Sequence, residues 1–93
     1  MARAIPLATG TADAQAVTGA CTLVGFSARE TGGTNSADVT FRDGTDASGA
    51  IKAIARLVAN GSQAGPLPPV DFATGIFIDR SGTGSSELVL YLL

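Results

Sequence analysis

Nucleophilic catalysis is the first chemistry for which the side chains of this chain can be tested. A serine, threonine or cysteine nucleophile needs a neighbouring base that accepts its proton. The sequence contains no histidine, which leaves Lys52 as the obvious nitrogen base. Because Lys52 lies in a segment of mixed character without a paired serine motif, the sequence predicts no catalytic residue and no enzyme.

A metal site is the second possibility. Asp43, Asp46 and Ser48 form a D-x-x-D-x-S pattern, and oxygen ligands in such a turn suit calcium. The EF-hand pattern is absent, however, and Asp and Ser are ordinary turn residues because their side chains bond nearby backbone N–H groups. The single cysteine, Cys21, lies in an apolar run typical of a small buried residue. We therefore predict no metal ligand and no cofactor.

The glycine-rich loops and the aromatic side chains are also interpreted as structural features rather than binding sites. The loop at residues 31–34 lacks the lysine that follows a phosphate-binding loop, and residues 82–84 read as a turn. Aromatic residues at strand spacing are typical of a core rather than of a stacking site. The expected core aromatics are Phe26, Phe41, Phe72, Phe77 and Tyr91.

Composition limits the class of protein. The 93 residues fit one domain, and the net charge of −2 with six scattered basic residues argues against nucleic-acid binding through phosphates. No apolar run approaches the roughly 20 residues of a membrane span, and the N-terminus lacks the apolar region of a secretory signal. With 45% hydrophobic and 15% charged residues, much of the surface is expected to meet other protein.

The elements that would position these residues read as strands. Residues 37–42 alternate in period two, with Val39 and Phe41 on one face. Residues 21–26 form another strand, in which a bulge at Gly25 and Phe26 switches the face. Residues 65–70 are a Pro-rich extended connection, and residues 72–79 and 87–93 are expected to form an antiparallel hairpin. Segment spacing of about ten residues indicates a sandwich or barrel.

Residues 50–58 fit two patterns. As a strand, they place Ile51, Ala53, Ala55 and Leu57 on one face. As a helix, they carry an apolar stripe, and alanine content favours the helix slightly. The sequence pattern alone favours neither the strand nor the helix for residues 50–58.

The C-terminal strand is apolar on both faces. Leu88, Leu90 and Leu92 would face one way, and Val89, Tyr91 and Leu93 the other. Leaving that second face in water would forgo about 1.5–3 kcal/mol per residue. Small domains gain extra stability from disulfides, metals or oligomerisation, and one cysteine excludes an intrachain disulfide. The second face is therefore predicted to be a subunit contact.

Several stretches together resemble small virion proteins of tailed bacteriophages, found among head and tail structural genes. They are T-G-A-C (18–21) with Leu23 and Gly25, R-E-T (29–31), V-T-F-R-D-G-T (39–45), I-A-R-L (54–57), P-P-V-D-F-A-T-G-I-F-I-D (68–79) and the apolar end with Tyr91. The resemblance covers residues 18–93 and rests on structural rather than catalytic patterns. It implies a compact β-sandwich, and it favours a strand at 50–58 that pairs with residues 37–42.

The expected fold is an all-β, small antiparallel sandwich, jelly-roll-like or barrel-like, with about six to eight strands. Residues 1–16 would be an N-terminal arm or edge strand and residues 17–93 the sandwich domain. The expected function is capsid decoration (cement) in the virion, assembled in the host cytoplasm, with tail, neck or glycan-binding tail-tip components as alternatives. The partners would be further copies in a homotrimer and the major capsid protein or another virion protein, without nucleic acid or membrane. The expected subunit or shell contacts are Ile5, Leu7, Val89, Tyr91 and Leu93.

Overall fold

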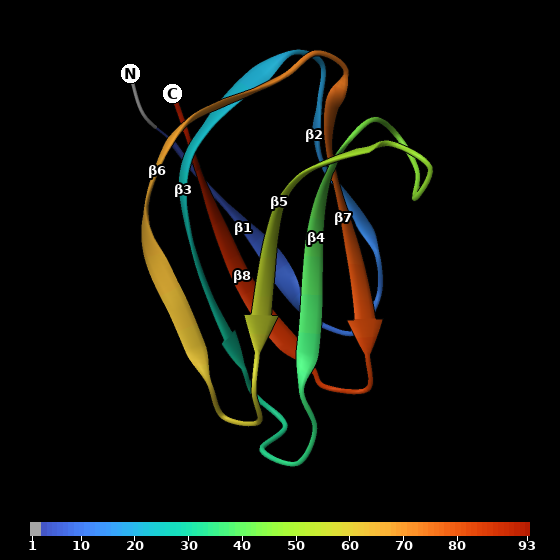
Figure 1. The fold of residues 1–93 in the computed structure, drawn as a ribbon, viewed down its shortest axis with the longest axis vertical. Coiled ribbons are helices and arrows are strands. Elements are labelled where there is room, and N and C mark those ends of the chain that lie inside the picture. The colour runs from blue at the N-terminus through green and yellow to red at the C-terminus, as the bar shows by residue number, and fades with distance from the viewer. Residues whose placement is uncertain (1–2) are drawn as a thin grey trace.

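The computed structural model describes residues 3–93, so the first two residues of the expected N-terminal segment lie outside the described residues. This part of the chain forms eight strands and no helix (Figure 1). The strands are β1 (Arg3–Gly10), β2 (Ala14–Thr18), β3 (Cys21–Glu30), β4 (Ala37–Asp43), β5 (Ala50–Leu57), β6 (Ser62–Phe72), β7 (Gly75–Gly82) and β8 (Ser86–Leu92). The expected all-β class and strand number are confirmed.

The strands divide between two four-stranded antiparallel sheets in a sandwich-like arrangement. Sheet A has the order β1-β8-β3-β6, and sheet B has the order β2-β7-β4-β5. Residues 3–18 therefore supply one edge strand to each sheet, β1 to sheet A and β2 to sheet B. In Figure 1, β1 and β8 run obliquely behind the more upright β5, β4 and β7, and β3 and β6 lie to the left of these strands.

The core lies between the sheets and follows the alternation of the strands. Leu88, Leu90 and Leu92 of β8 are fully buried, as predicted for one face of the C-terminal strand. Sheet B contributes Val39 and Phe41 of β4 and the isoleucines of β7. Removing such side chains from water is the main favourable term in folding.

The aromatic residues divide between the core and the surface. Phe26 and Phe41 come from opposite sheets, and their ring centroids lie 5.2 Å apart at an interplanar angle of 49°. Phe72 is also buried, so the core prediction is confirmed for these three. It is wrong for Tyr91, which is 39% exposed, and Phe77 is only half-buried. Both have odd positions in strands whose even positions face the core.

Two irregularities in register determine which side chains face inward. The β3 register shifts between Leu23 and Gly25, so the inward positions change from odd to even numbers and include Phe26. The predicted switch of face in this strand is confirmed, although the irregularity lies just before Gly25 rather than at Gly25 and Phe26. A second shift pairs Phe41 with Ala53 but Arg42 with Ile51.

This second shift places Ile51 on the outer face of sheet B. Residues 50–57 form strand β5 and pair with β4, which confirms the strand. Ile51 was expected to share a face with Ala53 and Ala55, but Ala55 is buried and Ile51 is 53% exposed. The extra residue, Lys52, moves Ile51 to the other face because side chains alternate along the strand.

The predicted hairpin between residues 72–79 and 87–93 is wrong. Strand β7 pairs with β2 and β4 in sheet B, whereas β8 pairs with β1 and β3 in sheet A. Residues 83–85 therefore cross between the layers. Gly84 permits this crossing, because a Cβ atom there would lie 2.6 Å from the Ser36 carbonyl oxygen.

The Pro-rich segment is an edge strand rather than a simple connection. Strand β6 pairs with β3 on one side only, and its prolines lie at positions 66, 68 and 69. Proline cannot donate to a ladder, so an edge is where a strand tolerates it.

Candidate interaction surface on the outer face of sheet A

The face of sheet A that points away from the core is built mainly from small and apolar residues. The register places Gly25 beside Tyr91, and Ser27 beside both Val89 and Ala64. These residues alternate with the core residues of the same strands, so they share the outer side. We call this set the sheet A outer face: Gly25, Ser27, Ala64, Pro66, Val89 and Tyr91.

Two shallow hollows adjoin on this face. One has a volume of about 220 Å³ and includes Val89, and the other has a volume of about 370 Å³ and includes Tyr91. Ser27 and Ala64 line both hollows. The small side chains of β3 and β6 therefore leave a concave strip into which larger side chains of another molecule can fit.

Tyr91 forms one wall of the strip. A Cβ atom on Gly25 would lie 3.7 Å from Cδ2 of Tyr91 and 3.0 Å from the Gly65 carbonyl oxygen. The absence of a side chain at position 25 thus leaves room for the ring between β8 and β6. The Tyr91 hydroxyl lies 3.2 Å from the Ser27 hydroxyl, in hydrogen-bonding range.

An ion pair lies beside the apolar strip. Arg29 Nε donates to Glu87 Oε1 at 2.9 Å, and the two side chains are 63% and 44% exposed. An exposed pair of this kind contributes little stability. An apolar centre with charged groups at its margin is the usual anatomy of a protein–protein interface.

The structure divides the five expected contact residues between two sides of sheet A. Val89 and Tyr91 lie on the outer face, and Leu93 is 66% exposed just beyond β8. Ile5 and Leu7 instead pair with Leu90 and Leu88, and both pack against the core. Edge strand β1 therefore turns its large apolar residues inward.

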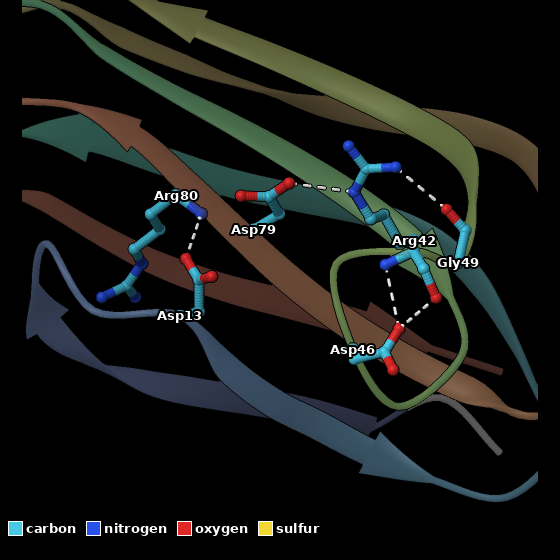
Figure 2. A network of polar contacts seen from close by, with 7 residues as sticks. Asp13, Arg42, Asp46, Gly49, Asp79 and Arg80 are labelled. Atoms are coloured by element: carbon cyan, nitrogen blue, oxygen red, sulfur yellow. Dashed lines mark hydrogen bonds and ion pairs between the residues drawn. The ribbon is translucent and has the colours of Figure 1, made fainter.

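Polar contacts of sheet B and its loops are shown in Figure 2. Arg42 Nε donates to Asp79 Oδ2 at 2.9 Å, and Arg42 also donates to the Gly49 carbonyl at 2.9 Å. Asp13 accepts a hydrogen bond from the Arg80 backbone N–H at 2.8 Å. These contacts hold loops against strands. The outer side of sheet B also carries apolar residues, because Ile51 and Ile54 are 53% and 62% exposed.

The aspartates of the D-x-x-D-x-S turn hold backbone groups. Asp46 accepts from the Ser48 backbone N–H and from its hydroxyl (Figure 2). Asp43 accepts from the N–H groups of Ala73 and Thr74, at 3.0 and 2.9 Å. These hydrogen bonds lower the pKa of both carboxyl groups. The two carboxylates cap different turns, which is the turn chemistry that competed with a calcium site.

A hollow of about 570 Å³ at one end of the sandwich is lined by residues that include Cys21, Asp43, Lys52 and Asp71. Thr22 fastens the rim by donating from its hydroxyl to Asp71 at 2.8 Å. Cys21 is half-buried rather than buried, and burial raises the pKa of its thiol. A raised pKa disfavours the nucleophilic thiolate.

Glu30 is an organising residue that the sequence analysis missed. It is only 3% exposed and accepts hydrogen bonds from the N–H groups of Gly32, Gly33, Asn60 and Ser85 at 2.7–3.1 Å. These bonds, led by the one from Gly33, lower the pKa of Glu30. Three loops converge on this one carboxylate. The available signal was a glutamate placed directly before a loop with two glycines.

Residues 3–93 hold no group of three or more His, Cys, Asp or Glu side chains placed to bind a metal ion. This part of the chain also has no helix of the length and apolar character needed to cross a membrane. In comparisons with known proteins, no family model, no curated protein and no solved structure matches this chain.

Proposed function

We propose that this chain is a structural protein of a tailed-bacteriophage virion, a capsid decoration protein that reinforces the head shell. The observation that carries the proposal is the sheet A outer face, where Val89 and Tyr91 border a concave strip of small residues. Covering such a face with another protein is favourable, because apolar surface is then removed from water. The resemblance of residues 18–93 to phage head and tail proteins gives the kind of partner.

The winding of the strands supports a jelly roll as the finer description of the fold. In chain order, β1 pairs with β8, β2 with β7, β3 with β6 and β4 with β5. A chain folded double and then rolled up gives this nested pairing, with four strands in each layer. Jelly rolls are frequent in viral capsid proteins, so this winding agrees with a virion role by analogy.

Self-association through the sheet A outer face would work by buried area rather than by chemistry. Val89, Tyr91 and Leu93 supply the large apolar groups, and the Arg29–Glu87 pair lies at the margin. In a homotrimer each copy would present the same contacts to the shell. Symmetry multiplies modest contacts into strong attachment. The proposed partners are other copies and the major capsid protein, in a virion assembled in the host cytoplasm.

Fractionation of phage particles tests the virion role. Particles from a host that carries the gene are separated into heads, tails and intact virions, and the chain is quantified in each. The proposal predicts many copies on heads, and it predicts that particles without the chain release DNA at lower temperature. Recovery with tails or necks would favour the alternative placement. Recovery in no particle fraction would contradict a virion role.

A further inference from the structure

Strand β5 combines an open edge with exposed apolar side chains. It pairs with β4 on one side only and is the last strand of sheet B. Ile54 is 62% exposed, and Val58, just after the strand, is 66% exposed. Alternating positions place both on the outer side of the sheet, with Arg56 between them. An open strand edge is a template for pairing with another chain.

The other three edges in the described part of the chain are less suited to adding a strand. Strand β6 carries three prolines, which remove backbone donors. Strand β1 has Pro6 near its centre and a register shift between Leu7 and Gly10. Strand β2 has only five residues. Strand β5 has eight residues without proline, and its register is regular from Ala53 to Leu57.

The charge of β5 selects the kind of partner. Its two charged residues, Lys52 and Arg56, are both cationic, and no acidic residue lies between positions 47 and 70. Arg56 is paired with Asp38 at 2.9 Å, but its side chain remains 77% exposed. Two copies of β5 paired side by side would bring two Lys52 and two Arg56 side chains onto one pair of strands, and like charges directly opposite each other destabilise a sheet. A partner segment with negative charge is therefore favoured.

We propose that the open edge of β5 accepts an extended acidic segment of a partner protein as an added strand. Residues 53–58 would supply backbone hydrogen bonds, which give affinity independent of sequence. Ile54 and Val58 would contact apolar residues at alternate positions of the segment, and a carboxylate between them would lie near Arg56. This surface belongs to sheet B, so the proposal stands independently of self-association through sheet A.

A peptide titration tests the proposal on the whole protein. The probe is acetyl-TVTETVT-amide, which presents Val, Glu and Val on one face of a strand, and the comparison is acetyl-TVTKTVT-amide. We expect saturable changes in the amide NMR signals of residues 53–58. We expect the glutamate peptide to bind about fivefold more tightly at low salt, because an exposed ion pair contributes up to about 1 kcal/mol. The difference should shrink in high salt.

Two variants decide which surface the peptide uses. Ile54→Asp should weaken binding by about tenfold or more, through lost apolar contact and added negative charge, while its exposed position lets the protein fold. Val89→Asp alters sheet A and should leave peptide affinity unchanged. The proposal is overturned if the two peptides bind equally, if the signal changes map to β1, β2 or β6, or if neither peptide binds. A drop in the oligomer mass of Ile54→Asp would assign the edge to a second copy and also overturn it.

Discussion

The hydroxyl group of Tyr91 on β8 lies 3.2 Å from the hydroxyl of Ser27 on β3, which orients the ring along the sheet A outer face. The ring passes Gly25, where a side chain would collide with the Gly65 carbonyl oxygen. A tyrosine held in this way offers a rigid apolar surface with a polar end. Tyrosine is enriched in protein–protein interfaces for that reason.

Tyr91→Phe and Tyr91→Ala form a matched pair of variants. Tyr91→Phe removes only the exposed hydrogen bond to Ser27, so we expect a loss of at most about 1 kcal/mol in the free energy of unfolding. Tyr91→Ala also removes the ring, and we expect weaker self-association with an intact fold. Urea unfolding and sedimentation measure the two effects. Equal self-association of both variants would exclude the ring from the contact.

Gly25→Ala tests the close approach of β3 and β6. The new Cβ atom would lie 3.0 Å from a backbone oxygen that cannot rotate away, so β6 must shift. We expect a loss of about 1–3 kcal/mol in the free energy of unfolding, as for overpacking elsewhere. The control is Ser27→Ala on the same strand, which adds no atom and loses only the exposed hydrogen bond to Tyr91, so it should cost at most about 1 kcal/mol. If Gly25→Ala unfolds at the same urea concentration as the wild type, the packing described for Tyr91 is wrong.

Leu90 and Val89 are neighbours on β8 with opposite surroundings. Leu90 is fully buried, so Leu90→Ala should lower the free energy of unfolding by about 2–5 kcal/mol. Val89 lies on the outer face, and Val89→Ala should cost less than about 1 kcal/mol at a protein concentration too low for self-association. Thermal unfolding at low protein concentration compares them. Similar losses would show that the outer face is packed within the subunit.

The alternating segments of this chain were predictable from sequence, and the long-range pairings were not. Period two placed Leu88, Leu90 and Leu92 on the buried face correctly, because alternation is a local property of the strand. The same local reasoning joined residues 72–79 to the C-terminal strand as a hairpin. A three-residue loop also fits a crossing between layers, and only the tertiary contacts of Gly84 distinguish the two.

The expected contact residues also show that local alternation is predictable from sequence and long-range pairing is not. Val89, Tyr91 and Leu93 lie where alternation put them, away from the core. Ile5 and Leu7 face inward because β1 pairs with β8 of the same chain, a register that the sequence does not reveal. Glu30 was missed because its role depends on loops that approach it from distant positions, such as Asn60 thirty residues further on.

Acid should destabilise the protein partly through Glu30. Four backbone hydrogen bonds lower the pKa of its carboxyl group in the folded state, so the unfolded state binds a proton more readily. The contribution of Glu30 is therefore complete above its ordinary pKa of 4.5 and is lost as the pH falls through the lower pKa of the folded state. The lowered pKa values of Asp43 and Asp46 act in the same direction.

Glu30→Gln isolates the part of the acid response that belongs to this residue. We expect the variant to unfold at lower temperature at neutral pH, because an amide presents one acceptor oxygen to four N–H donors. We also expect a smaller further loss on acidification than in the wild type. Glu87→Gln changes an exposed carboxylate and is the control. An acid response in Glu30→Gln equal to that of the wild type would contradict this role.

The native mass of the protein at micromolar concentration tests the central claim most directly. The wild type should be an oligomer, with a homotrimer as the expected mass. The Val89→Asp, Leu93→Asp double variant should be a folded monomer, because two buried carboxylates without partners would oppose association. Circular dichroism confirms that the variant is folded. A monomeric wild type, or a double variant with the wild-type mass, would contradict assembly through the outer face of sheet A.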